Sequence, residues 1–358
     1  QRLFGPKRAA PETRYWIKTN HSAPNGRVVA VNPAHPEPKD WVEIIPESEH
    51  VLRGVSMVGG RLFVNHLKDV HSVVHVHDLE GNRIGEVPLP GIGTAYGFGG
   101  KSTDDETFYS FTGFSSPPTI HRYTVSTGKS RVWKSSNVEF NPDEVEVSQQ
   151  FYTSNDGTKI PMFVMHKKGL ELNGQNPTIL YGYGGFNISL TPSFSMSRVV
   201  WLEMGGVYAI ANLRGGGEYG ESWHKAGTKQ NKQNVFDDFI SGAEHLIASG
   251  YTSPERLGIM GGSNGGLLVG AAMTQRPELF GAAVPSVGVL DMLRYHKFTI
   301  GWAWADDYGT SEESAEMFEY LKGYSPVHNV TEGTVYPDTM IVTADHDDRV
   351  VPAHSYKF

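Results

Sequence analysis

The sequence predicts two parts: a piece of a β-propeller, followed by an α/β domain whose mostly parallel sheet has helices on both faces. Three observations support this. Strand-like segments separated by turns fill residues 12–136, apolar strands alternate with amphipathic helices after residue 140, and a glycine-rich serine motif follows one of these strands. We therefore expect a partial propeller over residues 1–139 and the α/β domain over residues 140–358.

The first part repeats with a period of about 40 to 45 residues, which suggests about three propeller blades. The repeats cover residues 12–46, 51–91 and 96–136. Each contains short β-branched or aromatic segments, among them Arg27–Asn32, Arg61–His66, Ser72–Asp78 and Thr119–Ser126. A β-sandwich is the alternative. Three blades cannot close a ring, because propellers have roughly four to eight.

In the second part, five short apolar runs predict the strands of the sheet: Thr178–Tyr181, Val207–Asn212, Leu257–Met260, Ala282–Pro285 and Met340–Ala344. Amphipathic stretches between them predict helices over Asn234–Ser249, Gly265–Thr274 and Glu312–Leu321. The turn at residues 155–157 predicts a hairpin that joins Gln149–Ser154 to Thr158–His166, which would form an antiparallel edge of the same sheet.

Composition argues against several classes of function. The chain has no cysteine, which removes disulfides, thiolate catalysis and most structural zinc sites. Its net charge is -8 and its basic residues are scattered, which disfavours a nucleic-acid partner. No apolar run is long enough to predict a membrane span. His71, His75 and His77 could ligate a metal, but solvent-facing histidines are commoner, so we expect neither a metal nor a cofactor.

The strongest motif is G-x-S-x-G, formed by Gly261, Ser263 and Gly265. A predicted strand precedes it and an apolar helix follows it. Ser263 is therefore expected on the sharp strand-to-helix turn of an α/β-hydrolase, with its hydroxyl lifted above the sheet as a nucleophile. The same turn puts the backbone amide of Asn264 at a helix N-terminus, where it can donate to an oxyanion.

In this fold an acid and then a histidine follow the serine. The acid is expected after the run Met340–Ala344, among Asp345, Asp347 and Asp348, with a charged surface loop as the alternative. The histidine is the difficulty. His354 lies in a short predicted helix and His346 adjoins the acids, so neither is well placed to bridge the acid and Ser263.

These motifs resemble those of the prolyl oligopeptidase family of serine peptidases. The resemblance covers essentially all of residues 140–358. It rests on four ordered motifs, at residues 181–186, at 214–220 with Trp223 and His224, at 261–266 and at 345–352. It implies a serine endopeptidase that hydrolyses short peptides on the carboxyl side of proline through an acyl-enzyme, without a cofactor.

The resemblance also implies a role for each matching residue. Ser263 would be the nucleophile and Asp347 the triad acid, and the Tyr183 hydroxyl and Asn264 amide would form the oxyanion hole. Trp304 would stack on the substrate proline and Arg349 would bind a substrate carbonyl. The remaining lining residues would be Phe186, Val289, Ile300, Tyr308 and Val350.

Members of the family have a histidine some tens of residues after the triad acid, and a seven-bladed propeller. The chain is therefore expected to be an internal fragment that lacks the catalytic histidine and is inactive as it stands. We expect short proline-containing peptides as partners, no nucleic-acid or membrane partner, and a monomer. The expected compartment is the cytoplasm, with the periplasm as the alternative.

Three other functions remain open on the sequence alone. The first is another hydrolase of the same family, such as an acylaminoacyl peptidase, an esterase or a peptidase for basic residues. The second is a non-catalytic propeller module that binds a partner. The third is a nucleotide-binding oxidoreductase, suggested by the G-x-G-x-x-G spacing at residues 215–220, although no clear apolar helix follows it.

Overall fold

The computed structural model describes residues 3–4 and 14–358. It divides into two compact units. The first comprises residues 1–140 together with 191–195 and 218–222, and the second comprises the remaining residues up to Phe358. Residues 12 and 13, where the first predicted repeat begins, lie outside the described residues.

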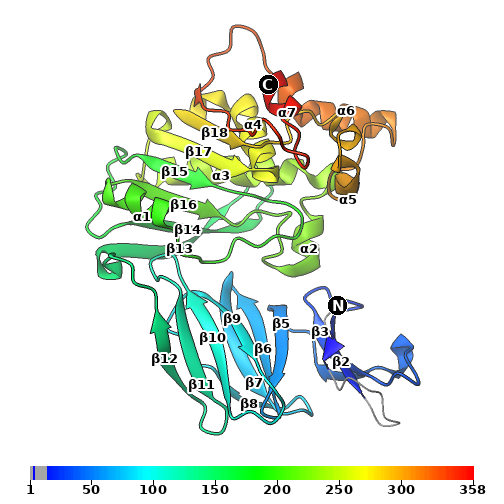
Figure 1. Ribbon diagram of the computed structural model, residues 1–358. Coiled ribbons are helices and arrows are strands. Elements are labelled where there is room, and N and C mark those ends of the chain that lie inside the picture. Colours follow the sequence, from blue (N-terminus) through cyan, green and yellow to red (C-terminus); the bar gives the residue numbers. More distant parts are fainter. Residues whose placement is uncertain (1–2, 5–13) are drawn as a thin grey trace. The chain divides into compact units, whose positions relative to one another are not determined.

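The described residues of the first unit form three four-stranded antiparallel sheets (Figure 1). Within each sheet the strands lie side by side in chain order, which is the arrangement of a propeller blade. The propeller prediction is thus confirmed over the β-sandwich. The strands are β1 (Leu3–Phe4), β2 (Tyr15–Thr19), β3 (Arg27–Val31), β4 (Val42–Ile45), β5 (Val51–Val58), β6 (Arg61–Lys68), β7 (His71–His77), β8 (Arg83–Glu86), β9 (Thr94–Gly99), β10 (Glu106–Thr112), β11 (Thr119–Thr124) and β12 (Lys129–Ser135).

Neighbouring sheets in this unit pack face to face. Alternate residues of a strand point to opposite faces, so one sheet can supply apolar side chains to both neighbours. On β6, Leu62 and Val64 pack with residues of the first sheet, whereas Phe63 packs with residues of the third. Phe98 stacks between Phe63 and Tyr109, with ring centroids 5.2 Å and 4.8 Å away.

Seven strands form the sheet of the second unit, in the order β13-β14-β16-β15-β17-β18-β19. The first two form the predicted antiparallel hairpin, and β14 also pairs antiparallel with β16. The remaining pairs are parallel, as the alternation of strands and helices predicted. The strands are β13 (Val145–Thr153), β14 (Lys159–Lys167), β15 (Thr178–Tyr181), β16 (Val207–Ala211), β17 (Leu257–Gly262), β18 (Ala282–Ser286) and β19 (Asp338–Thr339).

Helices cover this sheet on both faces. On β14, Met162 and Val164 belong to the core under α3 and α4, while Phe163 and Met165 are buried on the other face, where α1 packs. The helices are α1 (Met196–Glu203), α2 (Gly220–Lys225), α3 (Gln233–Ala248), α4 (Asn264–Gln275), α5 (Ala305–Tyr308), α6 (Ala315–Tyr324) and α7 (Ala353–Lys357).

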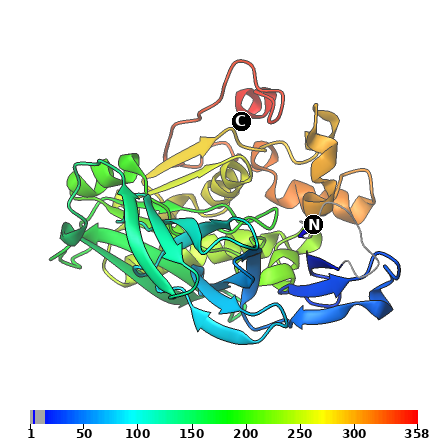
Figure 2. The ribbon, with the colours of Figure 1, turned by 60° about the horizontal axis from the view of Figure 1, so that its bottom comes forward.

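The strand predicted at Met340–Ala344 is wrong in its position. The last strand, β19, is two residues long and ends at Thr339, and beyond it only Val342 forms an isolated bridge, to Ser286. This segment has β18 on one side only, so Met340 remains 61% exposed and the apolar run is not buried as a central strand would be. The chain before it forms the long orange-to-red loop seen in Figures 1 and 2.

Candidate active site

Ser263 stands between β17 and α4 in a strained backbone conformation. Its φ of 58° and ψ of -118° lie outside the regions that a residue with a Cβ atom normally occupies. The strand ends at Gly262 and the helix begins at Asn264, so the chain reverses at the serine itself. This is the geometry of a nucleophile elbow, which presents the serine hydroxyl above the sheet.

Close backbone packing explains why glycines surround this serine. A Cβ atom on Gly265 would lie 2.7 Å from the carbonyl oxygen of Gly182, and one on Gly266 would lie 2.5 Å from the Cα atom of Gly288. Both distances are shorter than real Cβ contacts. The first turn of α4 can therefore approach the neighbouring backbone only where side chains are missing.

Tyr183 and Asn264 both adjoin Ser263, Tyr183 through its hydroxyl and Asn264 as the next residue of the chain. Burial raises the pKa of the Tyr183 phenol, and a hydrogen bond with Ser263 and the charge of Arg349 act in the opposite direction. At neutral pH the phenol therefore keeps its proton and can donate it. The amide of Asn264 is the first of α4, and a helix leaves its first amides without partners inside the helix.

A small cavity of about 80 Å³ opens beside Ser263. Six of the other residues predicted for the site line it: Tyr183, Phe186, Val289, Trp304, Tyr308 and Arg349. These residues come from several segments of the second unit, among them the loop after β15 and the helix α5, so the fold brings together residues that are far apart in the chain. The cavity wall is mainly aromatic and aliphatic, with one cation at its edge.

Other predicted residues lie outside this cavity. Ile300 is 45% exposed, and Val350 is buried in the main core. Neither is among the residues that line the cavity. Ile188 does line it and was missed, because a lone isoleucine in a polar loop carries no signal of function.

Asp347 is held in a tight turn. Its Oδ1 atom accepts hydrogen bonds from the backbone amides of Arg349 and Val350, both at 2.9 Å. This turn fixes the carboxylate and leaves Oδ2 without a hydrogen bond to the described residues. Asp345, in contrast, is 88% exposed at its side chain and pairs with the equally exposed His346. Of these two acids, Asp347 is the better held.

His354 is unsuited to activate the serine. It is buried on α7, its Nδ1 atom accepts a hydrogen bond from the backbone amide of Asp291, and its ring packs edge-on against Phe298. Burial lowers the pKa of His354 to about 4. The sequence-based doubt about this histidine therefore agrees with its surroundings.

A polar network lies beneath the elbow and was not foreseen. The side chain of Asn264 donates from Nδ2 to the carbonyl of Tyr183 at 2.5 Å, and its Oδ1 atom accepts from the Tyr308 hydroxyl at 2.8 Å. The same Oδ1 accepts from Lys232 at 3.0 Å. Lys232 lies in a run of polar residues that is typical of a surface loop, so its burial could not be predicted from the local sequence.

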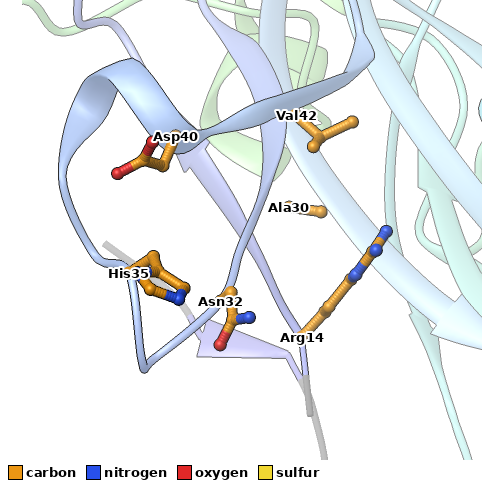
Figure 3. Close-up of a pocket in the computed structure, with 6 residues that line it drawn as sticks. All are labelled: Arg14, Ala30, Asn32, His35, Asp40 and Val42. Atoms are coloured by element: carbon orange, nitrogen blue, oxygen red, sulfur yellow. The ribbon is translucent and has the colours of Figure 1, made fainter. Parts of the chain in front are cut away.

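The first unit has cavities of its own. One of about 390 Å³ is lined by Arg14, Ala30, Asn32, His35, Asp40 and Val42, with Asn32, His35 and Asp40 along a single loop (Figure 3). It offers polar groups but no serine, threonine or lysine nucleophile.

Within the described ranges no group of three or more histidines or acids could hold a metal ion, His75 and His77 included. No helix there is long and apolar enough to cross a bilayer.

Comparison with known proteins agrees with the fold. The family model described as "Prolyl oligopeptidase family" matches residues 192–358, and that of its N-terminal β-propeller domain matches residues 8–136. A prolyl endopeptidase of Elizabethkingia miricola is 55% identical over 343 residues, which are 96% of this chain and 48% of that protein. The chain thus spans about half the length of the curated relatives it matches.

Solved structures give the same result. One from a study of two prolyl endopeptidases has a TM-score of 0.94 and 50% identity, and covers 99% of this chain and 52% of that one. Prolyl oligopeptidase B from Galerina marginata has a TM-score of 0.93 and 36% identity, and the matched region covers 99% of this chain and 50% of that one. The chain belongs to the prolyl oligopeptidase family of serine peptidases.

Proposed function

We propose that this chain is part of a serine endopeptidase that cleaves short peptides on the carboxyl side of proline. One observation carries the proposal: the strained Ser263 opens onto a small cavity walled by Trp304, Phe186 and Tyr308. Proline is a compact apolar ring without an amide hydrogen. Aromatic faces offer such a ring contact area without requiring a hydrogen-bond donor.

In the proposed reaction the Ser263 oxygen attacks the carbonyl carbon of the proline whose ring occupies the cavity. The carbonyl oxygen becomes an oxyanion, which the Tyr183 hydroxyl and the Asn264 amide stabilise. A general base takes the proton of Ser263 and gives it to the amine of the leaving peptide as this intermediate collapses. This leaves an acyl-enzyme, which water then hydrolyses. Arg349, at the edge of the cavity, would bind a carbonyl of the peptide.

A relative supports Asp347 as the triad acid. Structures of Galerina marginata prolyl oligopeptidase B were solved with a serine, an aspartate or a histidine replaced by alanine. The replaced serine and aspartate are separated by as many positions as Ser263 and Asp347. The replaced histidine follows the aspartate by more positions than follow Asp347 here. We therefore propose that a histidine outside residues 1–358 acts as the base in the complete protein.

We also propose that residues 1–139 and 140–358 are the propeller part and the catalytic part of that protein. Val350 would then support the cavity from the core that it shares with Val289 and Tyr308. The partners would be short proline-containing peptides.

The test uses the complete protein and its Ser263→Ala variant. A fluorophosphonate probe is expected to label Ser263 in the unaltered protein only. Mass spectrometry of a mixed peptide library should then show cuts after proline. A protein that is folded but neither labels nor cleaves would refute the catalytic reading, and cuts after basic residues would refute the proline pocket.

A further inference from the structure

Two buried groups of opposite charge hold the loop that carries Tyr183 and Phe186. One is Lys232, whose side chain is fully buried at the start of α3. Its Nζ atom donates to the carbonyl oxygen of Gly184 at 2.9 Å and to Oδ1 of Asn264 at 3.0 Å, and it lies 5.3 Å from the ring centre of Tyr308.

The second group is Asp307 on α5, which is also buried. Its Oδ2 atom accepts the backbone amide of Phe186 at 3.0 Å, and its Oδ1 atom pairs with Nε2 of His224 at 2.7 Å. Phe186 has a φ of 56°, in the left-handed region that a bulky residue rarely adopts. The bond from Asp307 therefore holds a strained backbone, and with it the ring that walls the cavity.

Burying either charge costs free energy, which hydrogen bonds and an opposite charge must offset. Desolvation lowers the pKa of Lys232 to about 8, and the negative charge of Asp307 acts against this lowering. The hydrogen bonds of Lys232 go to the two segments that bear the proposed oxyanion donors. Those of Asp307 go to the pocket wall and to His224. The two charges thus act on different parts of the proposed reaction.

We propose that Lys232 and Asp307 are positioning residues, Lys232 for the oxyanion donors Tyr183 and Asn264, and Asp307 for the proline-pocket wall at Phe186. This rests on the function proposed above. It predicts that loss of Lys232 weakens the chemical step, whereas loss of Asp307 weakens the binding of proline. A role in stability alone would not separate these two effects.

The experiment compares kcat and KM for a proline-containing peptide in the complete protein. Lys232→Met has a similar length and no charge, and should lower kcat roughly 10- to 100-fold with KM changed less than about 3-fold. Asp307→Ala should raise KM about 10-fold or more with a smaller effect on kcat. Asp307→Asn should recover much of the KM, because its amide oxygen can still accept from Phe186.

A control separates positioning from general loss of stability. Tyr152→Phe removes another buried hydrogen bond of the same unit, from the Tyr152 hydroxyl to the carbonyl of Asp238 at 2.7 Å. It should lower the melting temperature without changing kcat or KM. The proposal is overturned if Lys232→Met keeps its kcat, if Asp307→Asn fares no better than Asp307→Ala, or if Tyr152→Phe reproduces the kcat loss.

Failure of the proposed function would look different. If the unaltered complete protein neither labels with the probe nor cleaves, the peptidase proposal fails, and the positioning is then decided by crystal structures. In Lys232→Met the Tyr183 hydroxyl should move by about 1 Å or more relative to Ser263, a shift large enough to affect catalysis. An unchanged position would overturn the role of Lys232.

Discussion

The rings of Trp304 and Tyr295 lie nearly parallel, with an interplanar angle of 11° and centroids 6.3 Å apart. Tyr295 is itself fully buried, and its hydroxyl donates to the carbonyl of Gly309 at 2.5 Å. The indole therefore has a fixed backing, while Trp304 also lines the cavity beside Ser263. An aromatic surface that is already held in place loses little conformational freedom when a ligand ring packs on it.

We predict that Trp304→Ala in the complete protein lowers kcat/KM for cleavage after proline by about 10- to 100-fold, because about 1.5 to 3 kcal/mol of apolar contact is lost. Cleavage after alanine, if any, should change much less. Trp302→Ala is the matched control, since that indole is 68% exposed. The measurement is kcat/KM for paired peptides that differ only at the proline. Equal losses for both peptides would contradict a proline-stacking role.

Tyr183→Phe tests the oxyanion hole by removing one hydroxyl and keeping the ring. Because the donor acts on charge that develops in the transition state, kcat should fall roughly 100- to 1000-fold while KM changes little. Tyr356→Phe, at a residue 73% exposed, controls for loss of a tyrosine hydroxyl as such. Steady-state kinetics of the complete protein decide the matter, and an unchanged kcat would exclude this hydroxyl from the oxyanion hole.

Much of the fold could be predicted because its signals are local. The run Thr178–Tyr181 is apolar and β15 has the same bounds, and the G-x-S-x-G motif lies on the strand-to-helix turn where it was expected. Met340–Ala344 shows the limit of such signals. An apolar run indicates strand propensity, but whether the strand is buried depends on what lies on its second side, which local sequence does not contain.

The network beneath the site could not be predicted, for a related reason. Lys232 is buried only because Gly184 and Asn264, both far away in the chain, offer it acceptors. In sequence it is one lysine of a polar run. Asp307 likewise follows another aspartate, and nothing local distinguishes the buried carboxylate from its exposed neighbour.

Acid should weaken the first unit through His66. Burial, followed by the charges of His75, His50 and His77, lowers the pKa of His66 to about 4. Between pH 6.5 and pH 4 this histidine is then protonated in the unfolded chain but largely neutral in the folded one. The free energy of unfolding therefore falls as the pH falls through that range. For one such histidine the loss is about 2 to 3 kcal/mol by pH 4.

His66→Leu should remove this part of the pH dependence. As the pH falls from 7 to 4, the unaltered protein should lose more unfolding free energy than the variant. If the variant is the less stable protein at pH 7, the two free energies therefore converge. Urea unfolding at several pH values measures this. His346→Leu is the control, because the His346 side chain is 94% exposed. The same pH slope in His66→Leu as in the unaltered protein would show that His66 does not carry the effect.

The buried pair Arg214–Asp238 should be a main point of stability in the second unit. The guanidinium donates to both oxygens of Asp238, at 2.7 to 3.2 Å, and the Arg214 amide donates to Oδ2 at 3.1 Å. Asp238→Ala would leave the buried cation with Asp156 alone, a carboxylate 47% exposed. We expect a loss of about 3 to 5 kcal/mol in the free energy of unfolding, because a buried charge loses its main partner.

A second arginine provides the comparison. Arg276 also pairs with two acids, Glu244 and Glu278, but its side chain is 39% exposed. In Arg276→Ala the two carboxylates lose their partner, but they are 44% and 61% exposed and water solvates them, so the substitution should cost no more than about 1 kcal/mol. Urea unfolding of both variants measures the difference. Similar losses for Asp238→Ala and Arg276→Ala would contradict this explanation. They would mean that burial of the Arg214 charge does not determine how much stability is lost with its ion pair.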